Sequence, residues 1–304
     1  MTSIEKNLDD SRIPLIELRD GYSIPQLGLG VFQLHGETCY NSVRAALEAG
    51  YRHVDTAAVY GNEEEVGRAI SDAIAAGDVT REELFITTKL WNDSHDRVRD
   101  AFHESLTKLG LDYVDLYLLH WPLEKLGQYV GAYRKMLELR AEQKTASVGV
   151  CNCYPEVLDD ITSATGDTPV VNQIEVHPGF SQEALRADNS RRGIITEVWS
   201  PLAAGQNFDA GDIHSELKRI ADNHGVTVGQ AIIRWHIQRG DIVIPRSSNP
   251  GRIAENADVF GFELTDEEVA QIVRLNRSTG RRGPDPLTFY AGTELEDAKY
   301  SFQI

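Results

Sequence analysis

Short apolar runs with the character of β-strands recur along the chain and alternate with stretches in which apolar residues return every three or four positions. The runs are typical of strands, and the three- and four-residue spacing is typical of amphipathic helices. Most of the runs are continuously apolar, as is usual for a parallel sheet covered by helices. We therefore predict eight strands, at residues 26–32, 51–57, 84–90, 112–120, 146–150, 170–176, 194–200 and 241–247.

A further pair of short strands is predicted before this repeating part. Residues 14–18 and 22–26 flank Asp20-Gly21, a dipeptide that favours a tight hairpin turn. A hairpin in this place is expected to plug one end of a barrel. Residues 1–12 contain no apolar segment, and we predict that they form a flexible lead-in.

The carboxyl-terminal part of the chain departs from the simple alternation. Thr265 and Glu268 form a capping-box sequence, which predicts the start of a helix. Residues 280–304 are predicted to form a tail near the barrel mouth. Helical spacing recurs at 212–223 and 227–239 before the eighth strand, and at 250–258 and 265–276 after it.

This order of elements fits either a doubly wound sheet or a closed barrel. No strand–helix junction carries GxGxxG or GxxxxGK[ST], the usual dinucleotide and phosphate fingerprints of open sheets. Polar, potentially reactive residues instead follow several different strands, and in a barrel such positions converge on one mouth. We therefore predict an α/β fold, a (β/α)8 TIM barrel that forms a single domain over residues 1–304.

Composition narrows the range of partners. The net charge of -17 argues against nucleic acid or an anionic membrane surface as a partner. No apolar run approaches the ~20 residues of a membrane-spanning helix. Three cysteines do not make a disulfide framework, and Cys151 and Cys153 lack the second pair that a zinc site needs. We expect reduced thiols, no metal site and a cytoplasmic protein, present as a monomer.

Four residues with complementary chemistry follow three adjacent predicted strands. Asp55 ends the second strand and is followed by Tyr60 in the next loop, Lys89 ends the third, and His120 ends the fourth. Each residue alone has an ordinary structural interpretation, such as a capping residue, half of an ion pair or a satisfied core histidine. Their common position at one end of the barrel favours a shared site.

The set suits the reduction of a carbonyl group. Hydride addition to the carbonyl carbon leaves negative charge on oxygen, which a tyrosine can protonate. A lysine ammonium beside the tyrosine is expected to lower its pKa from ~10, and Asp55 would compensate the buried Lys89 charge. His120, if neutral, can donate a hydrogen bond to the carbonyl oxygen. An isomerase or lyase that uses Lys89 as a Schiff-base amine is an alternative.

The same segments resemble a known family. GYRHVDTAAVYGNEEEVG (50–67), ITTKLWN (86–92) and LDYVDLYLLHWP (111–122) are similar to the characteristic segments of the aldo-keto reductases, in the same order and on the same elements. GLGVFQ, TTKLWNDSHD, EVWSPLAAG and RSTGRRGPDP resemble the bacterial 2,5-diketo-D-gluconate reductase branch most. The resemblance implies that Tyr60 is the general acid, Lys89 its partner, Asp55 the partner of Lys89, and His120 the group that orients the carbonyl.

The resemblance also implies that NADPH binds across the barrel mouth. Cys151 stands where the family usually has serine, and Arg246 where it usually has lysine; an arginine keeps the charge and suits phosphate. Trp199 is expected to stack on the nicotinamide ring. The residues expected to hold the nicotinamide end are Cys151, Asn152, Gln173, Trp199, Ser200 and Leu202, and those at the phosphate and adenine end are Arg246, Ser247, Arg252, Glu255 and Asn256.

Aromatic residues after the first, third and fourth strands are expected to form the substrate pocket, namely Phe32, Trp91 and Trp121, together with His120. The short loop after His120 and the short tail predict an open pocket. The expected partner is a small carbonyl compound, with keto sugars such as 2,5-diketo-D-gluconate and dicarbonyls as candidate substrates. A cofactor-binding accessory or redox-sensing barrel without turnover is the alternative function.

Overall fold

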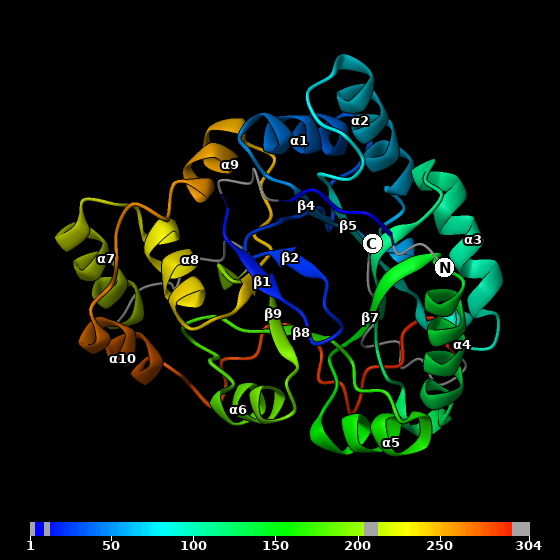
Figure 1. Ribbon diagram of the computed structural model, residues 1–304. Helices are drawn as coiled ribbons and strands as arrows, with labels where there is room; N and C mark the ends of the chain where they lie inside the picture. The colour runs from blue at the N-terminus through cyan, green and yellow to red at the C-terminus, as the bar shows by residue number, and fades with distance from the viewer. Residues whose placement is uncertain (1–3, 9–12, 204–211, 294–304) are drawn as a thin grey trace.

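The computed structural model describes residues 4–8, 13–203 and 212–293, and its centre is a sheet of eight parallel strands (Figure 1). Neighbouring strands follow the chain order from β3 to β10, as expected for a repeated βα unit. The bounds of the strands are β3 Leu29–Gly30, β4 His53–Asp55, β5 Phe85–Leu90, β6 Val114–Leu119, β7 Thr145–Cys151, β8 Val171–Glu175, β9 Ile195–Trp199 and β10 Ile242–Val243.

The first and last strands meet and close the sheet into a barrel. Leu27 forms a parallel bridge with Val243. On either side of it, the Val243 amide donates to Gln26 O at 2.9 Å and the Gly28 amide donates to Val243 O at 2.9 Å. Closure leaves no free sheet edge. The predicted (β/α)8 barrel is therefore confirmed. Seven of the eight strands lie inside the predicted ranges, and β7 extends the predicted range 146–150 by one residue at each end.

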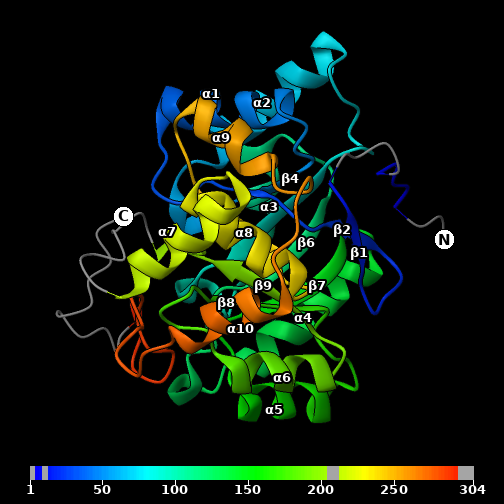
Figure 2. The ribbon, with the colours of Figure 1, turned by 90° about the vertical axis from the view of Figure 1, so that its left-hand side faces the viewer.

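Helices surround the barrel, and their apolar faces pack on the outside of the strands (Figures 1 and 2). Ile70 of α2, Phe102 of α3 and Met136 of α4 are fully buried in this layer. The helices are α1 Gly36–Glu48, α2 Glu63–Ala76, α3 Val98–Leu109, α4 Tyr129–Ala141, α5 Pro155–Thr165, α6 Glu183–Arg191, α7 Asp212–His224, α8 Val228–Gln238, α9 Pro250–Ala257 and α10 Asp266–Arg274, with short 3-10 turns η1 Ala58–Tyr60, η2 Asn92–Ser94 and η3 Glu124–Leu126.

The predicted hairpin closes the amino-terminal end of the barrel. Strands β1 Leu15–Glu17 and β2 Ser23–Pro25 pair antiparallel and lie across the opening (Figure 1). Leu18 and Ile24 are buried in a core cluster with Phe85 and Leu116 from the barrel interior. This apolar plug excludes water from the half of the barrel interior nearest to the hairpin.

Residues 4–8 also contact this end of the molecule. Leu8 is buried in the same cluster, and Lys6 Nζ lies 2.6 Å from the carboxylate of Asp115. The Asn7 amide donates to Glu82 O at 3.0 Å. These contacts differ from the flexible lead-in predicted for residues 1–12, whose remaining residues lie outside the described ranges.

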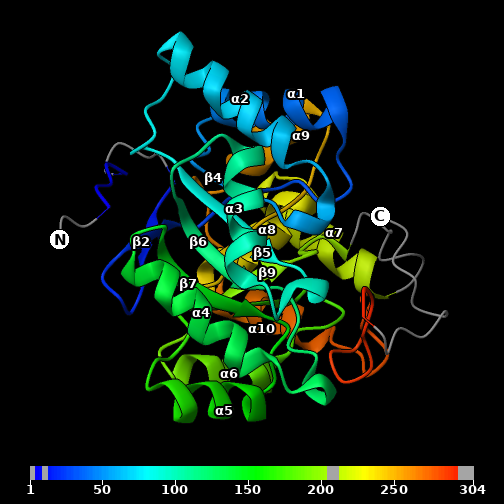
Figure 3. The same ribbon diagram turned by 90° about the vertical axis from the view of Figure 1, so that its right-hand side faces the viewer.

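The carboxyl-terminal segment lies at the opposite end of the barrel from the hairpin (Figures 2 and 3). Helix α10 begins with the predicted capping box, in which the side chains of Thr265 and Glu268 each accept from the other's backbone amide. The following tail, described to residue 293, packs Phe289 and Tyr290 against Trp121 and Leu123. The last part of the predicted tail, 294–304, lies outside the described residues. None of the helices in the described ranges is long and apolar enough to cross a membrane.

Close packing between α2 and α3 yields a test of the fold. A Cβ on Gly67 would lie 2.3 Å from Leu109 O, whereas a Cβ on Gly131 of α4 would meet nothing within 4 Å. Gly67→Ala should lower the free energy of unfolding by about 1 to 3 kcal/mol through this overlap, despite alanine's better helix propensity. Gly131→Ala should raise it by up to about 1 kcal/mol. Urea unfolding measures both, and equal effects of the two substitutions would contradict the described packing.

Candidate active site

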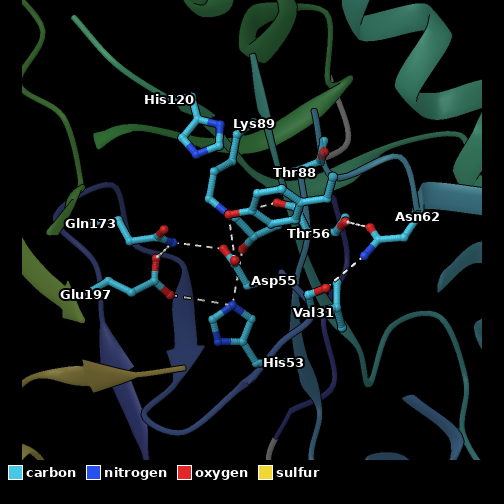
Figure 4. A network of polar contacts seen from close by, with 12 residues as sticks. Val31, His53, Asp55, Thr56, Asn62, Thr88, Lys89, His120, Gln173 and Glu197 are labelled. Atoms are coloured by element: carbon cyan, nitrogen blue, oxygen red, sulfur yellow. Dashed lines mark hydrogen bonds and ion pairs between the residues drawn. The ribbon is translucent and has the colours of Figure 1, made fainter. Parts of the chain in front are cut away.

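The barrel mouth brings together the four residues that the sequence singled out. Asp55 ends β4, Lys89 lies near the end of β5, His120 directly follows β6, and Tyr60 ends the turn η1 after β4. Lys89 is fully buried, and the other three are at most 8% exposed. Figure 4 shows Asp55, Lys89 and His120 converging from their separate strands.

Lys89 is the centre of this arrangement. Its ammonium donates to Asp55 Oδ1 at 2.6 Å, to the carbonyl of Thr56 at 2.8 Å, and to Tyr60 Oη at 3.3 Å. An ammonium group has three hydrogens, so all of them are used. The geometry therefore fixes the ammonium beside the phenol and leaves Lys89 no freedom to act elsewhere.

The ion pair keeps Lys89 charged in an apolar interior. Burial lowers the pKa of Lys89, but the carboxylate of Asp55, together with smaller contributions from Tyr60 and Cys151, holds the pKa above its ordinary value. A charged, fully hydrogen-bonded ammonium is a poor nucleophile, because imine formation requires the free amine. This argues against the Schiff-base alternative.

The pKa of Tyr60 differs from the sequence prediction. Burial of the phenol raises the pKa of Tyr60 to about 12, although the Lys89 ammonium acts in the opposite direction. The predicted direction of the Lys89 contribution is correct, but the predicted net lowering is wrong, because the phenol loses more by desolvation than it gains from the ammonium. Tyr60 is therefore a protonated hydroxyl at neutral pH, the state that a proton donor needs.

A buried asparagine holds the loop that carries Tyr60. Asn62 Nδ2 donates to Val31 O and Leu34 O, both at 2.8 Å, and Asn62 Oδ1 accepts from Thr56 Oγ1 at 2.7 Å (Figure 4). These bonds tie the loop after β4 to the loop after β3. Tyr60 and Phe32, which lie on these two loops, are thereby held with their ring centroids 5.1 Å apart.

His120 is a neutral imidazole within an aromatic wall. Burial, and secondarily the charge of Lys89, hold the pKa of His120 well below its ordinary value. Its ring centroid lies 5.7 Å from that of Tyr60 and 5.1 Å from that of Trp91. A neutral histidine can donate one hydrogen bond without adding charge, as predicted for a group that orients a carbonyl oxygen.

The predicted substrate-binding aromatics reach the same place. Phe32 contacts Tyr60 and Trp91 contacts His120, while Trp121 is 4% exposed because Phe289 of the tail packs on it at 4.3 Å between ring centroids. The short tail thus covers one side of the mouth instead of leaving it open there. Sequence patterns could not reveal Phe289, since the tail has no periodicity.

The residues expected at the nicotinamide end are linked to this site. Asn152 Nδ2 donates to His120 O at 3.0 Å, and Asn152 Oδ1 accepts from Trp199 Nε1 at 3.0 Å. Gln173 Nε2 donates to Asp55 Oδ2 at 2.8 Å. The other residues expected here lie beside them: Cys151 is buried in β7, and Ser200 and Leu202 are partly buried just after β9.

The residues expected at the phosphate and adenine end lie just before α9 and along it. Asn249 caps this helix by accepting from the Arg252 amide at 3.0 Å. Arg246 donates to Phe32 O at 3.3 Å, and Glu255 accepts from Thr227 at 2.9 Å. A helix start flanked by exposed arginines is suited to a phosphate group. Ser247 lies in the turn before the helix, and Asn256 is buried near its end.

The sequence interpretation missed two buried carboxylates. Glu197 of β9 accepts from Gln173 Nε2 at 2.8 Å, and Glu175 of β8 accepts from the backbone amides of Arg282 and Gly283 in the tail at 2.7 and 3.0 Å. A Cβ on Gly283 would lie 2.3 Å from the Trp199 ring, so the tail packs directly on that side chain. The alternation of side chains along each strand could have pointed to these two carboxylates. Glu197 lies on the same face of β9 as Trp199, and Glu175 lies on the same face of β8 as Gln173.

The comparisons with known proteins agree with this geometry. The model of the aldo/keto reductase family matches residues 26–277, and the chain belongs to this family. It is 49% identical over 277 residues to the methylglyoxal reductase DkgA of Escherichia coli K12, covering 90% of this chain and 98% of that protein. It is 48% identical to an aldo-keto reductase of Mycobacterium sp. strain JLS, covering 91% and 98%.

Solved structures give the same result. A mutant of Gox0644 in complex with NADPH superposes with a TM-score of 0.85 at 42% identity, covering 92% of this chain and 99% of that one. A Bombyx mori aldo-keto reductase in complex with NADP gives a TM-score of 0.82 at 42% identity, covering 89% and 94%. The family predicted from the sequence is confirmed.

We predict that loss of the ion pair between Lys89 and Asp55 strongly lowers the stability of the fold. Lys89→Met leaves Asp55 buried with Gln173 as its remaining neutral donor, and should lower the free energy of unfolding by about 3 to 5 kcal/mol. The double substitution Lys89→Met with Asp55→Asn removes both charges and should recover part of this loss. Urea unfolding followed by circular dichroism measures both variants. Unfolding of the Lys89→Met protein at the wild-type urea concentration would contradict the described pair.

Proposed function

Because the chain is an aldo/keto reductase, we propose that it reduces an aldehyde or ketone with NADPH, with Tyr60 as the proton donor. The observation that carries this proposal is the position of one buried ammonium between a carboxylate and a phenol. Lys89 Nζ lies 2.6 Å from Asp55 and 3.3 Å from Tyr60 Oη. The ammonium stabilises the negative charge that Tyr60 acquires when it gives up its proton.

The proposed roles follow from the chemistry of carbonyl reduction. Bound NADPH supplies the hydride that adds to the carbonyl carbon, and the developing charge on oxygen takes the proton of Tyr60. His120, neutral and beside Tyr60, donates a hydrogen bond to the same oxygen and orients it. Phe32, Trp91 and Trp121 exclude water from the reacting carbonyl. The phenolate is then reprotonated from solvent, and the reverse sequence oxidises an alcohol.

The donor set fits an extended dinucleotide. Asn152 and Gln173 offer amides for a nicotinamide carboxamide, and Trp199, with Ser200 and Leu202 beyond it, offers a flat apolar face for the ring. Arg246, Ser247 and Arg252 surround the start of α9, where the 2′-phosphate of NADPH would lie. Glu255 and Asn256, farther along α9, would contact the adenine. NADH lacks the phosphate, so NADPH is the preferred cofactor.

The proposed substrates are small dicarbonyls and keto sugars, with 2,5-diketo-D-gluconate among the candidates. The aromatic wall and the 49% identity to a protein named methylglyoxal reductase support this class. The proposed working form is a monomer. NADPH consumption with methylglyoxal, 2,5-diketo-D-gluconate and aromatic aldehydes, compared by kcat/KM, tests the class. Binding of NADPH without turnover of any of these compounds would favour the accessory role instead.

Removal of the Tyr60 hydroxyl tests the assigned acid. Tyr60→Phe keeps the ring and its contact with Phe32 but removes the donor, so kcat should fall by about 100- to 10,000-fold. The dissociation constant of NADPH, measured by quenching of protein fluorescence, should stay within about twofold of wild type. Retained turnover in this variant would exclude Tyr60 as the acid.

Removal of one arginine tests the proposed phosphate site. Arg252→Ala should raise the KM for NADPH by about tenfold, the effect of losing one charge-assisted hydrogen bond, and should leave the KM for NADH unchanged. The ratio of the two kcat/KM values measures the preference. Arg274, exposed on α10 and paired with Glu267, provides the control substitution Arg274→Ala. An equal rise in both KM values would place the phosphate elsewhere.

A further inference from the structure

The barrel interior contains a second buried carboxylate that has no role in the proton transfer described above. Glu197 is fully buried in the middle of β9 and lies beside Gln173 in the parallel register of β8 and β9. Its Oε2 accepts from Gln173 Nε2 at 2.8 Å, and its Oε1 lies 3.6 Å from His53 Nε2. Figure 4 shows Glu197 and Asp55 on the two sides of the Gln173 amide.

The two carboxyl groups determine which way this amide points. Gln173 Nε2 lies 2.8 Å from Asp55 Oδ2 and 2.8 Å from Glu197 Oε2, so both of its hydrogens are used. An amide turned the other way would place its oxygen against the Asp55 carboxylate, which can only accept, and this contact is repulsive. A single carboxylate would hold one hydrogen and leave the amide freer to rotate. The pair fixes the nitrogen toward the interior and the oxygen away from it.

The amide oxygen of Gln173 is consequently available to a ligand. No donor among the described residues contacts Gln173 Oε1. Asn152, the other amide at this end of the site, already uses its oxygen to accept from Trp199 and one amide hydrogen to donate to His120 O. Asn152 therefore keeps one amide hydrogen to donate, and Gln173, whose two amide hydrogens are both used, can only accept. This donor and acceptor complement the oxygen and the NH2 of a primary carboxamide.

Side-chain alternation along β9 places Glu197 directly below the position expected for the cofactor. Side chains two residues apart on a strand share a face. Ile195 packs against the cluster at the plugged end, Glu197 lies in the middle, and Trp199 lies at the mouth, where its indole binds Asn152. Glu197 thus lies one layer below the residue expected to contact the nicotinamide ring, and it acts through Gln173.

Glu197 fulfils this role as a neutral acid. Burial, and secondarily the nearby charge of Asp55, raise the pKa of Glu197 to about 8. The ionisable groups that face it are Asp55 and His53 of β4, Lys89 of β5 and Cys151 of β7. Burial lowers the pKa of His53 to about 3, so no opposite charge on His53 offsets an ionised Glu197. A neutral glutamine is therefore the matched conservative replacement.

We propose that Glu197 is a positioning residue which, together with Asp55, holds the Gln173 amide so that its oxygen accepts from the NH2 of a carboxamide ligand, the nicotinamide carboxamide. This inference rests on the proposed function for the identity of the ligand. It assigns to Glu197 a contribution to recognition of the carboxamide and none to the proton transfer at Tyr60.

Equilibrium binding of two cofactors to the full-length protein tests the proposal. NADP⁺ carries the carboxamide NH2, whereas in 3-acetylpyridine adenine dinucleotide phosphate a methyl group replaces it. Wild type should bind NADP⁺ more tightly than the analogue by about 3- to 10-fold, the effect of one hydrogen bond. Glu197→Met should weaken NADP⁺ binding by a similar factor and leave the analogue unchanged. Quenching of tryptophan fluorescence and calorimetry measure both dissociation constants.

Further variants make the result specific. Glu197→Gln, which offers the same acceptor, should keep the wild-type ratio of the two constants within about twofold. Thr196→Val, on the opposite face of β9, should also keep it. Glu197→Asp withdraws the acceptor by one methylene and should reduce the ratio of the two dissociation constants. This variant provides the test if Glu197→Met does not fold. Glu197→Met combined with Gln173→Met should give the same ratio as Gln173→Met alone.

Two results would overturn the proposal. Equal weakening of both cofactors by Glu197→Met would indicate a general loss of structure, and equal wild-type affinities for the two cofactors would show that the NH2 is not recognised. The binding measurement requires no turnover, so it does not use the proposed acid role of Tyr60. Turnover by Tyr60→Phe would therefore overturn the acid assignment while leaving the measured ratio as an independent test of Glu197.

Discussion

The site depends on one buried ion pair, Lys89 with Asp55, in the interior of a closed barrel. A lysine without water around it is stable only if its charge and all three of its hydrogens are satisfied. Asp55, the Thr56 carbonyl and Tyr60 satisfy them. The contacts that stabilise the buried charge of Lys89 therefore also hold the phenol of Tyr60 beside that charge. The contacts that stabilise the Lys89 charge are thus the same ones on which its proposed chemical role depends.

The rest of the barrel supports this pair in layers. The hairpin and the apolar residues around Ile24 and Phe85 close the lower end. A polar middle layer follows, in which Gln173 links Asp55 to Glu197. The aromatic mouth lies above it, with Phe289 of the tail packed on Trp121. Each layer removes water from the next, which strengthens the electrostatic contacts of Lys89.

Much of this could be predicted from the sequence. The eight strands, the hairpin and the capping box at Thr265 follow from periodicity and turn chemistry, which depend on neighbouring residues alone. The convergence of Asp55, Lys89 and His120 follows from the rule that strand ends share one mouth. The resemblance to the aldo-keto reductases pointed to the same residues.

The remaining features depend on distances across the barrel, which spacing does not supply. The stagger between strands decides that Glu197 lies level with Gln173 and Asp55, and no local pattern encodes it. The raised pKa of Tyr60 depends on how completely the phenol is buried, which only the packed structure shows. The contact of Glu175 with the amides of Arg282 and Gly283 joins a strand to a tail that has no periodicity of its own.

The most direct measurement is the titration of Tyr60 in the protein without cofactor, by NMR of 13Cζ-labelled tyrosine with Tyr60→Phe used to assign the signal. Burial sets the pKa at about 12. A tyrosine whose pKa is raised above its ordinary value stays protonated to higher pH, so the Tyr60 signal should not shift between pH 6 and about pH 10. Formation of the phenolate with a midpoint below about pH 9 would contradict the account, because the ammonium of Lys89 would then outweigh burial.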